Sequence, residues 1–224
     1  GNLVLRAARA LAAVRSGLRT GRFHLVKRLP VASGIGGGSA DAAAALRLLA
    51  RLNGIAPADL LLRQVAAGVG ADVSVCLDSR ARVMAGIGEK LGPVLRLPPL
   101  FAVLVNPGVG VETVAVFRAL GLKAGEMQAE TRATKLAAPA SASELVGYLA
   151  SMVNDLSPPA QRIAPVIGEV LDRLAALPGC RLARMSGSGA TCYALFDDCA
   201  ASAAAAKALQ RDRPGWWVKP TLLS

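Results

Sequence analysis

Apolar residues recur with helical spacing at the start of the chain. In NLVLRAARALAAVRSG, the residues Leu3, Ala7, Leu11 and Val14 lie three or four positions apart. This spacing places them on one face of a helix, and Gly17 supplies a stop signal. The sequence therefore predicts a domain helix at this end of the chain.

The next apolar patterns predict a strand and two more helices. RFHLVKRLP at 22–30 fits a short strand with alternate apolar positions, which Pro30 ends. After a glycine-rich loop, the spacing of alanine and leucine predicts a helix from about Ser39 to Leu52, closed by Asn53 and Gly54. APADLLLRQVAAG at 56–68 predicts a helix with Pro57 in its first turn and Gly68 at its end.

Strand-like patterns dominate the middle of the chain. In GADVSVCLDS at 70–79, the apolar residues Val73, Val75 and Leu77 alternate with polar or small ones and predict a strand. RARVMAGIGEKLGPVLRL predicts a hairpin that turns near 86–88. FAVLVNPG at 101–108 predicts a buried strand that ends at the Asn-Pro-Gly turn.

Helices and strands alternate in the last part of the chain. CRLARMSGSGATCYALFDD at 180–198 predicts a strand, a glycine turn and a second strand, and WWVKPTLL predicts a closing strand. Segment 121–142 has little periodicity and is expected to be mobile. The remaining patterns predict helices at 114–120, 143–152, 159–177 and 200–211. This order indicates an α+β protein, and two prolines near 97–100 predict a division into domains 1–96 and 97–224.

Composition narrows the classes of function. No apolar run approaches the roughly 18 residues that a membrane helix needs, so we expect a soluble, cytoplasmic protein without a membrane partner. The net charge of +11 suits a polyanion, but aromatic residues make up only 4% of the chain, and single-strand binders stack bases on aromatic side chains. We therefore expect no nucleic-acid partner. A small phosphorylated ligand and a plain basic surface both fit the charge.

The cysteines and the histidine predict no metal centre. Cys76, Cys180, Cys192 and Cys199 form no CxxC pair, and His24 stands apart from any other ligand. We expect reduced, mostly buried thiols. The basic residues and lack of acidic ones before Ala40 also suit an organellar transit peptide, against which the helical spacing described above argues.

The glycine-rich loop SGIGGGS at 33–39 carries the strongest chemical signal. A helix N-terminus presents unpaired amide N–H groups and the positive end of the helix dipole, and phosphate oxygens satisfy both. Glycines leave room for a phosphate chain to approach those amides. The hydroxyls of Ser33 and Ser39 add hydrogen-bond donors, and Ser39 could also reach a metal ion.

Two common glycine motifs do not fit this loop. A Walker A loop ends in Gly-Lys-Ser/Thr, whereas this loop ends in Gly38-Ser39-Ala40 and has no lysine. The dinucleotide fingerprint GxGxxG would put its third glycine at Ser39, so that motif fails as well. A loop whose glycines only permit tight helix packing remains the plain alternative, although consecutive glycines cost backbone entropy.

Three stretches together point to a known family. PVASGIGGGSADAAA at 30–44 resembles the phosphate-binding motif of the GHMP kinases, a family of small-molecule kinases. RMSGSGATCYALF at 184–196 resembles the family's C-terminal glycine motif, and GADVSVCL at 70–77 resembles the segment with its catalytic aspartate. NLVLRAA, KRLP, NPG and NDL also fall in the expected order, so the resemblance spans nearly the whole chain.

The resemblance implies a fold and a reaction. The fold is a two-domain GHMP kinase fold, with an S5-like nucleotide-binding domain followed by a ferredoxin-like α/β domain. The wording of the motifs resembles the members that use ATP and Mg²⁺ to phosphorylate a hydroxyl of a small molecule, cytidine diphosphate-linked methylerythritol. We expect a monomer or a weak dimer.

The resemblance also assigns site residues. Asp72 is the expected general base, although a residue that only caps the local turn fits its position from the sequence alone. Ser39 is the expected metal contact, and Asp41 is expected to be structural. Lys27 also fits a solvated charge, and the second glycine turn also fits an ordinary hairpin. The expected ATP-binding residues are Lys27, Pro30, Val31, Ala32, Ser33, Gly34, Ile35, Gly36, Gly37, Gly38, Ser39, Ala40, Gly187, Ser188 and Gly189.

One departure from the family pattern leaves other functions open. The family's N-terminal strand with a catalytic lysine, and the segment that binds cytidine, are not found before Gly1. We therefore expect a piece of a longer protein with an incomplete first domain, and the loss of activity in the chain as it stands is one of the outcomes left open. The alternatives are a non-catalytic nucleotide-binding module, a GHMP kinase for another alcohol such as homoserine, mevalonate or a sugar, and a basic nucleic-acid-binding protein.

Overall fold

The computed structural model describes residues 1–31, 33–121 and 139–224. Their contacts divide them into two compact units. Unit 1 contains residues 1–26 and 36–96, and unit 2 contains residues 27–35 and 97–224. The sequence places segment 27–35 in the first domain, whereas its contacts belong to unit 2. The division into domains 1–96 and 97–224 stays a prediction.

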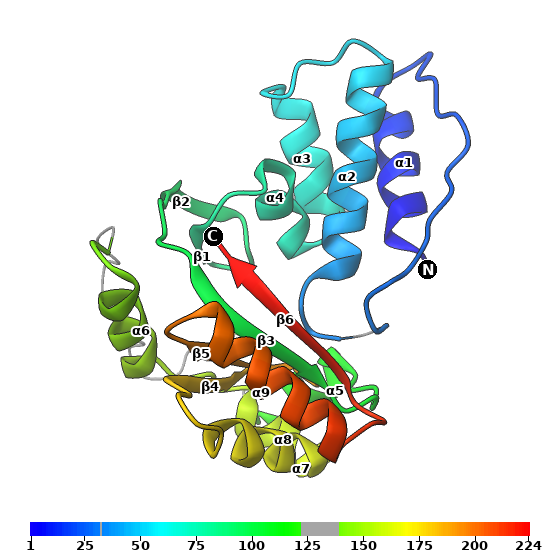
Figure 1. The fold of residues 1–224 in the computed structure, drawn as a ribbon. Helices are drawn as coiled ribbons and strands as arrows, with labels where there is room; N and C mark the ends of the chain where they lie inside the picture. The colour runs from blue at the N-terminus through cyan, green and yellow to red at the C-terminus, as the bar shows by residue number, and fades with distance from the viewer. Residues whose placement is uncertain (32, 122–138) are drawn as a thin grey trace. The chain divides into compact units, whose positions relative to one another are not determined.

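Unit 1 is a group of helices followed by a hairpin (Figure 1). Its elements are α1 (Leu3–Val14), α2 (Gly37–Leu52), α3 (Leu60–Val69), α4 (Ala71–Asp78), β1 (Arg82–Ala85) and β2 (Lys90–Val94). The four helices share one core, in which Leu11, Leu46, Leu62 and Val73 are buried. The hairpin at β1 and β2 confirms the sequence prediction, and Gly86 and Gly88 adopt positive φ in its turn.

Capping residues set where the helices of unit 1 begin. Asn2 accepts a hydrogen bond from the Val4 amide at the start of α1. Asp59 accepts one from the Leu61 amide at the start of α3. The prediction that Pro57 lies in the first turn of α3 is therefore wrong, because the Asp59 carboxylate caps the helix two residues later.

Two strands that the sequence predicts before residue 80 do not form. Segment 22–30 has no regular structure. Segment 70–79 is the helix α4 instead of a strand. Val73 and Leu77 are four positions apart and both buried, so an i, i+4 helical pair coincides with a two-residue alternation. The eight residues of α4 are too few for the pattern to separate the two periods.

Unit 2 is built on a four-stranded antiparallel sheet in the order β4-β5-β3-β6. Strand, helices, hairpin, helix and strand follow one another as in a ferredoxin-like fold, which confirms the fold prediction. Its elements are β3 (Leu100–Asn106), α5 (Thr113–Ala119), α6 (Ala142–Ser151), α7 (Ser157–Ile163), α8 (Val166–Ala175), β4 (Leu182–Met185), β5 (Cys192–Phe196), α9 (Cys199–Asp212) and β6 (Trp217–Leu223).

Both faces of the β3–β5 pair are covered. Val103 and Val105 point to the core shared with α8 and α9. Ala102 and Leu195 point to the opposite face, where they pack with Leu145 of α6. Figure 1 shows α8 and α9 along the sheet and α6 at its end. Strand alternation therefore builds two cores within unit 2.

The single helix predicted at 159–177 is two helices, α7 and α8, because Pro165 lacks an amide donor and interrupts the hydrogen-bond ladder. The segment predicted to be mobile lies mostly outside the described residues. No described helix is long and apolar enough to cross a membrane.

The four cysteines are free thiols, as the sequence predicts, but only one of them is buried. Cys192 is buried, Cys199 is exposed, and Cys76 and Cys180 are partly buried. The expectation of mostly buried thiols is therefore wrong. Burial raises the pKa of the Cys192 thiol to about 12, so this group stays protonated at neutral pH.

Candidate active site

The N-terminus of α2 is a bare helix end in unit 1. Gly36 caps it in the left-handed conformation, with φ of 69°, and makes no side-chain capping bond. The Ala40 amide is the first to donate back, to the Gly36 carbonyl at 2.9 Å. Helix geometry leaves the amides of Gly37, Gly38 and Ser39 without a carbonyl partner in the helix. These donors and the helix dipole suit a phosphate group.

Gly36 and Gly38 are glycines for different physical reasons, one conformational and one steric. At Gly36 a side chain would not clash, because an added Cβ would meet nothing within 4 Å, but the positive φ disfavours residues other than glycine. Gly38 lies against α1, where a Cβ would approach Leu3 Cδ1 to 3.3 Å. Ser39, the expected metal contact, is partly exposed in the first turn of α2.

In unit 2, the start of the glycine loop lies against the second glycine turn. The Ser186 hydroxyl donates to the Gly34 carbonyl at 3.0 Å, although the two residues are 152 positions apart. The Thr191 amide donates to the Ser33 carbonyl at 3.2 Å. The Gly34 φ is +72°, and a Cβ on it would lie 2.2 Å from the Gly189 carbonyl oxygen. Gly34 is therefore the position at which the two backbones can meet this closely.

Two asparagines hold the second glycine turn from behind. The Asn154 side-chain amide donates to the carbonyls of Met185 and Gly187, at 3.0 and 2.8 Å. Its oxygen accepts from the Leu156 amide at 3.0 Å. The buried Asn106 donates to the Thr191 hydroxyl at 2.9 Å. The Asn154 side-chain NH2 group thus fixes the turn, while its oxygen fixes its own loop at Leu156.

Ser188 is held from another element of unit 2. Its hydroxyl lies 2.9 Å from the Thr113 hydroxyl at the start of α5. Ser188 is buried, and this contact satisfies a polar atom that would otherwise be costly to bury.

The sequence motifs NPG and NDL give no role to Asn106 and Asn154. Asn106 contacts a residue 85 positions away and Asn154 one 31 positions away, beyond any local pattern.

The segment before the glycine loop is largely exposed. Val31 is 81% exposed, which is unusual for a large apolar side chain. Lys27 is exposed and Pro30 partly exposed, and Ala32 lies outside the described residues. Ile35 ends the part of the loop that belongs to unit 2.

Asp72 lies in the first turn of α4 in unit 1, where its side chain is exposed. Its carboxylate affects the thiol of Cys76, one turn later. Burial raises the pKa of the Cys76 thiol, the Asp72 charge raises it further, and the Arg47 charge lowers it. A carboxylate in this position is favoured by the helix dipole and is open to a substrate.

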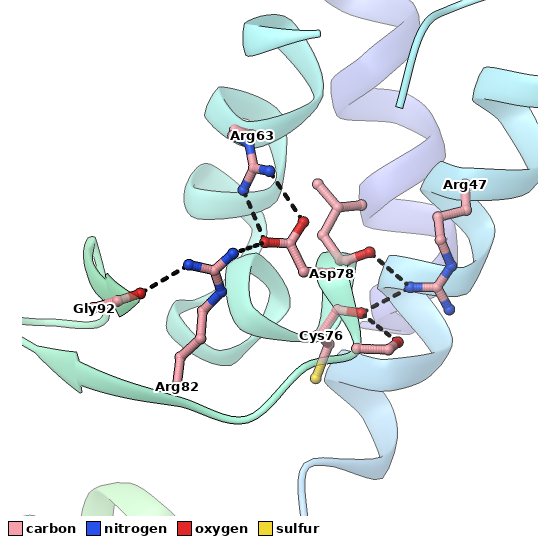
Figure 2. A network of polar contacts seen from close by, with 8 residues as sticks. Arg47, Arg63, Cys76, Asp78, Arg82 and Gly92 are labelled. Carbon is pink, nitrogen blue, oxygen red and sulfur yellow. Dashed lines mark hydrogen bonds and ion pairs between the residues drawn. The ribbon is translucent and has the colours of Figure 1, made fainter. Parts of the chain in front are cut away.

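The other end of α4 is surrounded by arginines. Arg47 of α2 donates to the carbonyls of Cys76 and Leu77, while Asp78 pairs with Arg63 of α3 and Arg82 of β1 (Figure 2). Sequence reasoning missed this arrangement. The arginines come from three elements, and their spacing in the sequence does not predict that they lie together at the end of α4.

The described residues contain no cluster of three or more His, Cys, Asp or Glu side chains that could hold a metal ion. Mg²⁺ commonly takes one or two protein oxygens together with substrate phosphates and water. The partly exposed Ser39 hydroxyl in the first turn of α2 is a side chain that could supply such an oxygen.

The comparisons with known proteins assign the family. Residues 2–80 match the model of the GHMP kinases N terminal domain, and residues 135–214 match the model of the GHMP kinases C terminal domain. A kinase from Methylobacterium radiotolerans is 59% identical over 222 residues, which are 99% of this chain and 76% of that protein. The chain belongs to the GHMP kinase family. It is therefore a small-molecule kinase with an alcohol acceptor, and the family uses ATP.

Relatives of this chain within the GHMP kinases range from 59% to 18% identity, and the identity decides what the likeness supports. The Methylobacterium relative is named 4-diphosphocytidyl-2-C-methyl-D-erythritol kinase. A solved structure of a 4-(cytidine 5'-diphospho)-2C-methyl-D-erythritol kinase is 34% identical with a TM-score of 0.76, over all of this chain and 78% of that one. The homoserine kinase of Cytophaga hutchinsonii is 18% identical with a TM-score of 0.68, over all of this chain and 76% of that one. At that identity the likeness concerns the fold alone.

Proposed function

We propose that this GHMP kinase transfers the γ-phosphoryl group of ATP to a hydroxyl of 4-diphosphocytidyl-2-C-methyl-D-erythritol. The observation that carries the proposal is the 59% identity with a relative of that name along 99% of the chain. The motif wording around the two glycine turns supports the same substrate.

ATP is proposed to bind along the glycine loop. The amides of Gly37, Gly38 and Ser39 at the start of α2 would donate to phosphate oxygens. The second turn, at Gly187, Ser188 and Gly189, would keep the loop in shape through the hydrogen bonds of its flanking residues, which are Ser186 to Gly34 and Thr191 to Ser33. The exposed Val31 and the neighbouring Lys27, Pro30, Ala32 and Ile35 are proposed to border the adenine.

Mg²⁺ would neutralise charge on the phosphates, and the Ser39 hydroxyl is the proposed protein ligand. Phosphoryl transfer depends mainly on positioning and charge neutralisation. The residues of this chain would therefore act by orienting the nucleotide, which the bare backbone of the loop permits.

Asp72 is proposed to be the general base. The acceptor oxygen would bond to the γ-phosphorus as the bond to the bridging oxygen of ADP breaks, and the hydroxyl proton would pass to the Asp72 carboxylate. An exposed carboxylate on a helix packed into the core of unit 1 suits this task, because it is accessible and its backbone is held.

The experiment compares ADP release and phosphorylated product for the protein and two variants. The variant Asp72→Asn removes the base. The control Asp172→Asn changes an exposed carboxylate on α8 that forms no ion pair within the described part of the chain. We expect Asp72→Asn to lower kcat by about 10²- to 10⁴-fold, with Asp172→Asn unchanged. ATP binding, followed by thermal shift, should persist in both.

Three outcomes would contradict the proposal at different points. Unchanged turnover in Asp72→Asn would remove the base assignment. Faster turnover with homoserine or mevalonate would replace the substrate. ATP binding without turnover of any of these alcohols would favour a non-catalytic nucleotide-binding module.

A further inference from the structure

The helix that carries Asp72 is short and weakly capped by its own residues. α4 has eight residues, which corresponds to about 12 Å of helix. Gly70 precedes it and makes no side-chain capping bond. Its last turn contains no basic residue, and its final residue, Asp78, places a negative charge at the negative end of the dipole. An isolated helix of this length would be unstable in water.

Neighbouring elements supply what α4 lacks. One nitrogen of Arg47, Nη1, donates to the carbonyls of Cys76 and Leu77 at 2.7 and 3.2 Å. These carbonyls belong to the last turn, whose acceptors have no partner in the helix. The Ser79 hydroxyl also donates to the Cys76 carbonyl, at 3.1 Å. Arg47 thus caps the carboxyl end of α4 from α2.

The Asp78 carboxylate is neutralised by two further arginines. Arg63 of α3 donates to both of its oxygens, at 3.0 and 3.2 Å. Arg82 donates to it at 2.9 Å and also to the Gly92 carbonyl of β2 at 2.8 Å. Figure 2 shows the three guanidinium groups converging on this one helix end. The carboxyl end of α4 is consequently connected to α2, α3 and the hairpin.

We propose that Arg47 is a positioning residue that holds α4 so that the Asp72 carboxylate meets the acceptor hydroxyl. The inference rests on the proposed role of Asp72 as base. Arg47 acts at one end of the helix and Asp72 lies at the other, so a tilt allowed at the carboxyl end displaces the carboxylate. A displacement of about 1 Å can cost about 100-fold in rate.

Arg47 is a better candidate for this role than the other two arginines. Arg63 and Arg82 bond to a side chain, Asp78, whereas Arg47 bonds to the helix backbone itself. Arg47 also lies in α2, the helix whose first turn contains Gly37, Gly38 and Ser39. One helix therefore begins with the proposed phosphate site and continues to the anchor of the proposed base.

The test uses Arg47→Met, Arg47→Lys and the control Arg51→Met. Arg51 is exposed in the last turn of the same helix, so its removal changes charge and helix propensity without touching α4. We expect Arg47→Met to lower kcat by about 10- to 100-fold and to leave KM for ATP within about twofold. Arg47→Lys keeps the charge but replaces the guanidinium group with an ammonium group, so its kcat should lie between those of the unmodified protein and Arg47→Met. Arg51→Met should match the unmodified protein.

A double-mutant cycle separates positioning from general destabilisation. If Arg47 acts through Asp72, adding Arg47→Met to Asp72→Asn should lower kcat by less than about twofold further. Equal losses in both backgrounds would mean that Arg47 is merely structural, and would overturn the inference. Full turnover in Asp72→Asn alone would instead overturn the proposed base.

Amide hydrogen exchange provides a readout that needs no turnover. In Arg47→Met, the amides of residues 74–78 should exchange about tenfold faster or more, while those of α1 keep their rates. Unchanged exchange in α4 would show that Arg47 does not hold the helix, and would overturn the inference. Arg47→Lys provides the same comparison if Arg47→Met does not fold.

Discussion

Gly34 shows how one residue can depend on a contact far away in the sequence. Its positive φ alone favours glycine, as at several other turns. The decisive constraint is the Gly189 carbonyl oxygen, which would lie 2.2 Å from an added Cβ. A side chain at this position would therefore cost both backbone strain and a steric clash. A second glycine with positive φ but no close neighbour can separate the two costs.

We predict that Gly34→Ala destabilises the protein by about 3 kcal/mol or more, because backbone strain and a steric clash add. Gly108→Ala is the control. Its φ is +81°, and a Cβ there meets nothing within 4 Å, so only the strain of about 1 kcal/mol applies. Urea unfolding of both variants measures the difference. Equal losses would show that the Gly34 contact tolerates a methyl group.

At the level of elements, α3, α4 and the hairpin β1–β2 are connected through one carboxylate. The Asp78 and Arg82 side chains are each only 19% exposed. Arg82 Nε is buried with no hydrogen-bond partner among the described residues, so Arg82 already has one unsatisfied donor. Loss of the Asp78 charge would also leave the Arg82 guanidinium without its counter-ion.

We predict that Asp78→Asn costs about 2 kcal/mol, since it leaves a largely buried guanidinium without its counter-ion. The control is Asp212→Asn, which breaks the pair of Asp212 with Arg211, whose side chains are 50% and 80% exposed. An exposed pair contributes about 0–1 kcal/mol. Each variant is compared with the unmodified protein through the denaturant midpoint of its own unit, and a shift for Asp78→Asn as small as that for Asp212→Asn would mean that the Asp78 network adds little.

For the whole molecule, the two units have separate hydrophobic cores. Leu46 is fully buried in the core of unit 1, and Leu174 is fully buried in a core of unit 2. The described core clusters do not mix residues of the two units. Units with their own cores can unfold separately, so two-state behaviour is not expected.

We predict two overlapping transitions in calorimetry, with a calorimetric enthalpy larger than the van't Hoff enthalpy. Leu46→Ala should lower one transition and Leu174→Ala the other, each by about 2–5 kcal/mol of stability. A single transition that both variants lower equally would show that the units unfold as one.

The sequence by itself determined the elements with clear local signals. The bare start of α2, the hairpin turn at Gly86 and Gly88 and the two strands around the second glycine turn all follow from short-range patterns. The motifs in their order also indicated the GHMP kinase family, which the family models confirm. These features depend on residues that are close in the chain, so local spacing is sufficient to find them.

The tertiary structure decided what local spacing could not. Val73, Val75 and Leu77 satisfy a strand and a helix equally, and packing of Val73 and Leu77 into the helical core of unit 1 selects the helix. The contact of Gly34 with the second glycine turn and the capping of α4 by Arg47 join distant residues. Such contacts form only when the whole chain has folded, because each partner is chosen by the arrangement of the elements that carry it.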